Sequence, residues 1–161
     1  MSPLTLWGSL VGALALAIVP LTDLLEPLRP PWITMAIIYW TMVWPRLCGP
    51  LTAFVMGLAL DLLYGSLLGQ HALSLTIVSF ITLWFHLQIR IFPLWQLTVT
   101  AFLLMIVDAF IVFWTDGIAG GPDLGLARWS QPIAGGLAWA PVMALLDNLR
   151  MRSENRSSRF L

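Results

Sequence analysis

The sequence alternates between long apolar runs and short polar segments, a pattern that predicts six helices. Clusters of proline, glycine and arginine mark the breaks, because these residues end or interrupt apolar helices. The expected helices run from about Leu4 to Leu21, from Trp32 to Trp44, from Gly49–Pro50 into the segment 57–69, from His71 to Ile89, from Leu94 to Trp114, and from Pro132 to Leu149 with a kink at Pro141. The second helix is short for a membrane crossing, so it extends into its flanks, lies where the bilayer is thin, or is re-entrant.

Composition assigns these runs to a membrane. Hydrophobic residues make up 59% of the 161 residues, charged residues make up 10%, and the mean hydropathy is +0.87. Soluble domains are roughly 45 to 50% apolar and 25% charged. We therefore expect an all-α integral membrane protein with six transmembrane helices. It forms one membrane domain, residues 1–149, followed by a short, basic and flexible tail, residues 150–161.

The arginines set the expected orientation, because cytoplasmic loops of membrane proteins carry the excess of basic residues. With both termini in the cytoplasm, the inner arginines are Arg46, Arg90, Arg150, Arg152, Arg156 and Arg159, and the outer ones are Arg29 and Arg128. The acids expected outside are Asp23, Glu26, Asp116 and Asp123, the last two in an exposed glycine-rich loop, 116–125. This distribution, six arginines inside and two outside, predicts a multi-pass protein with both termini in the cytoplasm.

Small residues predict close helix contacts in two places. Gly8 with Gly12, and Ala13 with Ala17, are spaced four apart in the first helix, which favours packing within the bundle over a dedicated partner site. In the third helix Gly57, Asp61, Gly65 and Gly69 also recur every four residues and would form one narrow stripe. This stripe is therefore the predicted packing or partner-binding element, with an acid inside it.

Asp61 and Asp108 are the two acids within apolar runs. A charged side chain in a membrane helix costs about 2.5 to 3.5 kcal/mol on insertion scales, so it faces a partner or a wet cavity. The two acids fall in the outer half of the bilayer. Three arrangements remain open: they line one outward-facing cavity, pair with arginine, or share a proton. Paired aspartates would also suit a membrane peptidase, but the Gly-x-Gly-Asp motif is absent.

Other chemistry has little support in the sequence. All eight basic residues are arginine, which excludes a lysine nucleophile. Cys48 is a lone cysteine, and His71 and His86 lie fifteen residues apart on one helix, so we expect packing roles and no metal site. No phosphate-binding motif is present. We expect no enzyme activity, no cofactor and no nucleic-acid partner.

The stretch from Gly57 to Leu73, with the acidic first loop, the turn at Trp44–Arg46 and the arginine-rich tail, resembles the MreD family of rod shape-determining proteins. The resemblance implies a non-enzymatic scaffold in the bacterial inner membrane that maintains cell shape. Its implied partners are MreC, indirectly MreB and the glycosyltransferase and transpeptidase pair that builds lateral peptidoglycan, and membrane lipid.

This family is similar in fold to the substrate-binding subunits of energy-coupling-factor vitamin transporters. Such a subunit is the alternative function, and it would need a cavity near the outer face, where Asp61 and Asp108 would lie. The stretch from Gly57 to Gly69 favours the MreD family.

Overall fold

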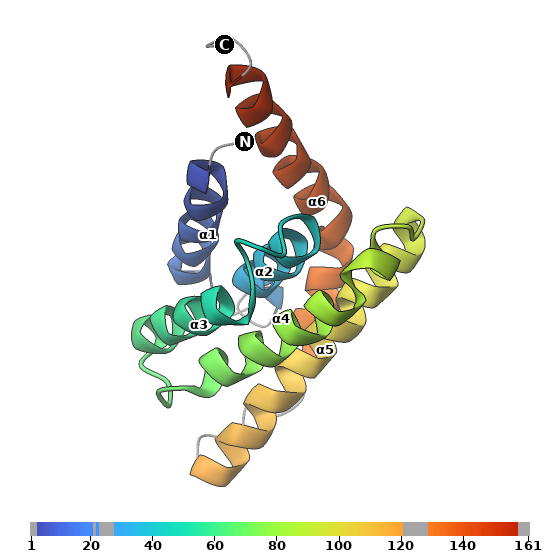
Figure 1. Cartoon of the computed structure of the whole chain (residues 1–161). Helices are drawn as coiled ribbons and strands as arrows, with labels where there is room; N and C mark the ends of the chain where they lie inside the picture. Colours follow the sequence, from blue (N-terminus) through green and yellow to red (C-terminus); the bar gives the residue numbers. More distant parts are fainter. Residues whose placement is uncertain (1–2, 21, 23–27, 121–128, 158–161) are drawn as a thin grey trace.

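The computed structural model describes residues 3–20, 22, 28–120 and 129–157, which form six helices and no strand (Figure 1). The helices are α1 (Pro3–Ile18), α2 (Trp32–Val43), α3 (Pro50–Tyr64), α4 (Gln70–Ile89), α5 (Leu94–Ala119) and α6 (Ser130–Ser157). The predicted number of helices is confirmed within the described residues. Their bounds differ from the expected ones chiefly at the ends of the third, fifth and sixth.

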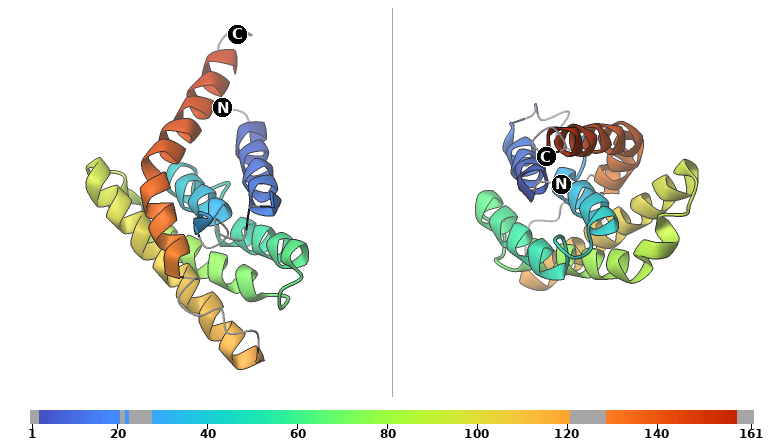
Figure 2. Two further views of the ribbon diagram at one scale, coloured as in Figure 1. Left: turned by 180° about the vertical axis from the view of Figure 1, so that it is seen from behind. Right: turned by 45° about the horizontal axis from the view of Figure 1, so that its top comes forward.

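The short helix α2 lies at the centre of the bundle. Every residue from Ile33 to Met42 is buried, and the other helices lie around α2 in the right-hand view of Figure 2. Its 12 residues span only about 18 Å at 1.5 Å per residue. Helix α1 packs its buried face of Leu6, Leu10, Ala13 and Ala17 on the bundle. The sequence therefore indicated correctly that the second helix is short, and its burial explains why it is apolar on all sides.

Small residues of α1 divide between the two faces of that helix. Ala13 and Ala17 are buried, so their predicted packing inside the bundle is confirmed. Gly8 and Gly12 are exposed, and a Cβ added at either would meet nothing within 4 Å. Packing of these glycines within the bundle was therefore a wrong expectation, because the helix turns them outward.

The predicted helical stripe does not continue past Tyr64. Gly65 has φ of 62° and ends α3, and Gly69 has φ of 100° and precedes α4, so both have left-handed backbones that favour glycine. Gly65 and Gly69 are therefore residues of the turn between two helices, and the expectation of one stripe through all four positions is wrong. Of the four, Gly57 and Asp61 lie on α3.

Helices α5 and α6 are longer than the apolar pattern predicts. Helix α5 passes through Asp116 and ends at Ala119, so the start of the expected loop at 116 was wrong. Helix α6 contains Pro141 and continues through the mostly polar residues 150–157. The described part of the expected flexible tail is therefore helical. The limit of the membrane domain at residue 149 stays a prediction, since no break in α6 marks it.

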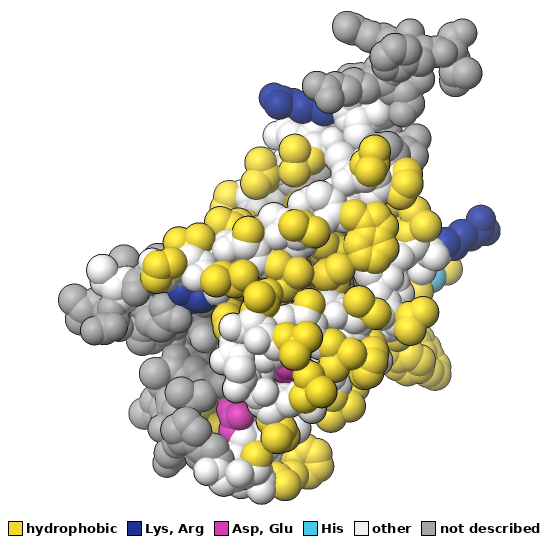
Figure 3. All heavy atoms as spheres, turned by 90° about the vertical axis from the view of Figure 1, so that its left-hand side faces the viewer, with side chains coloured by type: hydrophobic (Ala, Val, Ile, Leu, Met, Phe, Trp, Pro, Cys, Tyr) yellow, Lys and Arg dark blue, Asp and Glu magenta, His cyan; other side chains and the backbone are white. Residues whose placement is uncertain are grey.

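The described surface is strongly apolar. Large hydrophobic side chains are exposed on every helix except α2, including Phe80, Trp84, Leu103 and Phe110 of α4 and α5, and Figure 3 shows hydrophobic side chains over much of one face. Among the described residues, two helices are long and apolar enough to cross a membrane by length and composition, α4 and α5, while α1, α2 and α3 are shorter apolar helices. An apolar surface of this extent indicates contact with lipid or with other proteins.

Candidate functional site

The Asp61 carboxylate caps the beginning of the next helix. It accepts hydrogen bonds from the backbone N–H groups of Gly69 at 2.8 Å, His71 at 3.0 Å and Ala72 at 3.4 Å. The first N–H groups of a helix have no partner within that helix, and the helix dipole favours a negative charge there. Gly69 has no side chain to act as the cap. Asp61, 1% exposed, supplies this missing acceptor from the end of α3.

Gly57 lies where α3 and α4 come closest. A Cβ at this position would be 2.3 Å from the Cα of Ala72 and 2.6 Å from the carbonyl oxygen of His71, both backbone atoms. Nothing larger than glycine therefore fits without separating the two helices. Gly57 and Asp61 are one turn apart on α3, so the close approach and the cap are parts of the same junction.

His71 and Ser66 complete the junction around Asp61. The Nδ1 atom of His71 is 2.7 Å from Asp61 Oδ1, and the Ser66 hydroxyl donates to the same oxygen at 3.0 Å. The sequence predicted only a packing or interfacial role for His71. This arrangement is not a Ser-His-Asp triad, because Ser66 lies 3.5 Å from Nδ1, the nitrogen that faces the aspartate, whereas a triad serine bonds to Nε2.

Asp108 binds a different set of groups in the middle of the bundle. Its Oδ2 accepts a hydrogen bond of 2.7 Å from Thr34 of α2, and its Oδ1 accepts one from Ser74 of α4. Asp108 is 8% exposed. It therefore links three helices, α2, α4 and α5, through hydroxyl groups.

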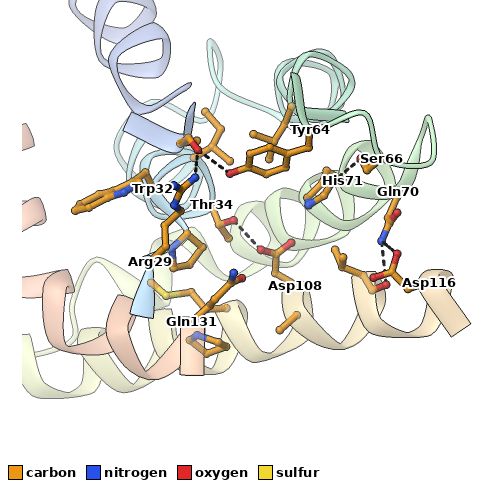
Figure 4. A pocket seen from close by; sticks show the side chains of 18 of the residues that line it. Arg29, Trp32, Thr34, Tyr64, Ser66, Gln70, His71, Asp108, Asp116 and Gln131 are labelled. Atoms are coloured by element: carbon orange, nitrogen blue, oxygen red, sulfur yellow. Dashed lines mark hydrogen bonds between the residues drawn. The ribbon is translucent and has the colours of Figure 1, made fainter. Parts of the chain in front are cut away.

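A cavity of about 550 Å³ opens beside Asp108 (Figure 4). Its polar lining comprises Arg29, Thr34, Tyr64, Ser66, Gln70, His71, Asp108, Asp116 and Gln131, and its apolar lining includes Trp32, Leu60, Met105, Ala109 and Val112. Asp108 lines the cavity, whereas Asp61 does not and lies behind His71. The expectation that both acids line one cavity is therefore wrong, because only Asp108 of the two lines it. No hydrogen bond joins the carboxylates of Asp61 and Asp108, so these two acids do not lie together as a peptidase pair.

Three further contacts were not predicted from the sequence. The Tyr39 hydroxyl, buried in α2, donates a hydrogen bond of 2.5 Å to Asp147 on α6. Gln70 donates to the Val112 carbonyl at 3.1 Å and to Asp116 at 2.5 Å. The apolar pattern alone gives no signal for these pairs, because their members lie more than 40 residues apart. Cys48 is buried, as expected for a packing residue.

The comparisons with known proteins agree on one class of membrane protein. The model of the family of rod shape-determining protein MreD matches residues 2–124. The rod shape-determining protein MreD of Haemophilus influenzae is 26% identical over 148 residues, which cover 92% of this chain and 91% of that protein. No solved structure matches the chain.

The apolar helical bundle and these matches define an all-helical membrane protein of the machinery that determines rod shape. The chain belongs to the MreD family. The family resemblance that the stretch from Gly57 to Leu73 carries is thereby confirmed. The expected similarity in fold to vitamin-transporter subunits finds no support among solved structures, and neither does the alternative function that depended on it.

Proposed function

We propose that this protein is a multi-pass, non-enzymatic scaffold of the rod complex in the bacterial inner membrane. It would bind MreC and, through it, help to organise MreB and the enzymes of lateral peptidoglycan synthesis. The match to the MreD family across residues 2–124 carries this proposal. The exposed apolar side chains support a location in the bilayer, in contact with lipid and with other membrane helices.

The lining of the cavity supports six crossings in alternating directions. It includes residues near the ends of α1, α3 and α5, such as Ala17, Tyr64 and Ala119, and residues at the starts of α2 and α4, such as Trp32 and Gln70, with Gln131 at the start of α6. Alternate ends of successive helices therefore meet at one end of the bundle. An up-and-down arrangement of this kind is what a chain that crosses the bilayer at every helix would have.

We place the cavity end outside and both termini in the cytoplasm. Three exposed arginines do not line the cavity: Arg46 and Arg90, in the turns after α2 and α4, and Arg152, in the last part of α6. Arg29 lies at the cavity. The side chain of Arg156, and Asp23, Glu26, Asp123, Arg128 and Arg159, lie outside the described residues. Labelling of single cysteines at Arg90 and at Gly120 with a membrane-impermeant maleimide tests this orientation. Both positions on one side of the membrane would contradict it.

The partner surface that the structure favours is the outer face of α1. Gly8 and Gly12 are exposed there with open space around them, beside the exposed side chains of Trp7 and Val11. Small residues four apart let a second membrane helix approach closely. Of the positions predicted from the sequence, Gly57, Asp61 and Asp108 contact the chain's own helices, whereas no atom lies within 4 Å of a Cβ added at Gly65 or Gly69.

Copurification from native membranes in mild detergent, followed by mass spectrometry, tests the function. We expect MreC and the wall-synthesis pair. Gly8→Leu with Gly12→Leu should reduce the recovery of MreC, and Val11→Leu on the same face is the matched control. Recovery of a transmembrane coupling subunit and ATPases instead would refute the scaffold and indicate a transporter.

A further inference from the structure

The cavity beside Asp108 is too large to be a packing defect. Protein interiors leave few voids larger than a water molecule, whose share of liquid volume is roughly 30 Å³. The volume of about 550 Å³ lies instead within the range of small-molecule pockets, about 300 to 1,000 Å³. Figure 4 shows polar side chains from several helices converging on it. The chemistry of this lining indicates what the cavity can bind.

Several hydrogen-bond donors of the lining are directed at the protein itself. The terminal nitrogens of Arg29 donate to the carbonyls of Ala17 and Val19, at the end of α1. The Nε2 atom of Gln70 donates to Val112 and Asp116. The hydroxyls of Thr34 and Tyr64 donate to Asp108 and to the Ala17 carbonyl.

The Asp108 carboxylate can accept further hydrogen bonds. Each Asp108 oxygen accepts from one hydroxyl, yet a carboxylate has about four lone-pair sites. The Asp61 carboxylate can only accept, so Nδ1 of His71 carries the shared hydrogen.

The surroundings of the Asp108 carboxyl group are the decisive observation. Within residues 28–120 and 129–157, the hydrogen bonds to its carboxylate come from the hydroxyls of Thr34 and Ser74, and no ion pair with a cation is formed. A carboxylate that is only 8% exposed is costly without a compensating positive charge. A cationic guest in the adjoining cavity would supply that charge.

We propose that the cavity binds a primary ammonium group carried on a partly apolar body. An ammonium has three N–H donors and no acceptor, which complements the acceptor capacity of the Asp108 carboxylate. Leu60, Met105 and Val112 would contact the apolar part. Two sources carry this chemistry: the headgroup of an ethanolamine phospholipid and a small soluble amine. This binding is separate from the scaffold function, because it requires neither a partner protein nor a particular orientation in the membrane.

Thermal unfolding of the purified full-length protein in detergent tests the proposal with three probes: free ethanolamine, dihexanoyl phosphatidylethanolamine and dihexanoyl phosphatidylcholine. The choline headgroup has a positive charge without N–H donors. We expect a saturable rise in melting temperature with at least one ethanolamine probe and none with the choline lipid. Asp108→Asn should weaken the apparent affinity at least tenfold, while Asp147→Asn, a matched loss of charge away from the cavity, should leave it unchanged.

Ala109→Leu is a second variant, which narrows the cavity and keeps every charge, so the test does not depend on the stability of Asp108→Asn. Ala109→Leu should abolish the rise in melting temperature that the ethanolamine probe causes. A shift with the lipid alone identifies a lipid site, and a shift with free ethanolamine alone identifies a soluble amine. Equal shifts with the choline lipid, an undiminished shift in both cavity variants, or no shift with either ethanolamine probe would overturn the proposal.

Discussion

Asp61 and His71 are joined twice, by a contact of 3.0 Å from the backbone N–H of His71 and one of 2.7 Å from its Nδ1 atom, both to the same carboxylate oxygen. Asp61 lies in the last turn of α3 and His71 in the first turn of α4. One carboxylate thus fixes the direction in which the chain leaves one helix and enters the next. The acid that looked most unusual in the apolar sequence therefore has a clear structural role.

Asp61→Leu should destabilise the protein strongly. The substitution leaves the N–H groups of Gly69 and His71 without their acceptor in a buried place, and hydrogen bonds to charged groups contribute about 1.5 to 3 kcal/mol each. We expect a loss of about 3 kcal/mol and a much reduced level of protein in the membrane. Thermal unfolding in detergent and immunoblotting of membranes measure the two effects.

Asp61→Asn is the graded form of this variant, because its amide oxygen still accepts while the charge is lost. Its stability should lie between those of the wild type and Asp61→Leu. Thr98→Ala, which removes an exposed hydroxyl bonded within its own helix, is the control. If Asp61→Leu were no less stable than Thr98→Ala, the cap would not contribute to the fold.

Gly57→Ala should separate α3 from α4. The added Cβ would lie 2.3 Å from a backbone atom of Ala72, which cannot move aside as a flexible side chain can. Overpacking in a filled interior costs typically about 1 to 3 kcal/mol, and this contact belongs at the upper end. Gly12→Ala is the matched control, since its Cβ meets nothing within 4 Å and alanine favours a helix by up to about 1 kcal/mol. Opposite shifts in melting temperature are expected, and equal shifts would argue against a close contact at Gly57.

The apolar pattern was enough to predict the helices. Helix α4 was placed within one residue of its true start, and α3 begins at the predicted Pro50, because prolines and glycines mark these ends in the sequence. The pattern was less informative where a helix continues beyond the apolar run. Asp116 and Arg150 are polar, yet α5 and α6 pass through them, since a helix that leaves an apolar environment need not end there.

The candidate site was only partly visible in the sequence. Asp61 and Asp108 stood out as acids in apolar runs, but their partners did not. The spacing of four residues predicts that Gly65 and Gly69 lie on one face of a helix. Spacing alone does not show that both residues have left-handed backbones, Gly65 at the end of α3 and Gly69 before α4. Ser74 and Thr34 approach Asp108 from two other helices, and their positions depend on how the bundle packs.

Tyr39→Phe should loosen the attachment of α6 to the central helix. The Tyr39 hydroxyl donates to Asp147, and Asp147 also lies 3.8 Å from Arg150, so the substitution removes the contact that holds this part of α6 to α2. The Asp147 side chain is 35% exposed and can rehydrate, so we expect a modest loss of about 1 kcal/mol. Trypsin should cleave at Arg150 and Arg152 faster in this variant. Asp147→Asn keeps an acceptor for the hydroxyl and should be cleaved more slowly than Asp147→Ala; the reverse order would exclude the tyrosine contact as the cause.

Cys48 should be inert to thiol reagents in the folded protein. It lies between α2 and α3 with no exposed surface, and burial raises the pKa of its thiol from 9.0 to about 11. The thiolate is the reactive form, so labelling by a maleimide at pH 7.5 should be negligible in mild detergent and complete in denaturant. Because the pKa is higher in the folded than in the unfolded protein, this group's contribution to stability is full below pH 9 and declines between pH 9 and about 11. Cys48→Ser should remove that decline, and rapid labelling of the folded protein would show instead that the segment opens. Because the buried Cys48 should not react with maleimide, a single cysteine introduced at position 90 or 120 can be labelled without a background signal from Cys48.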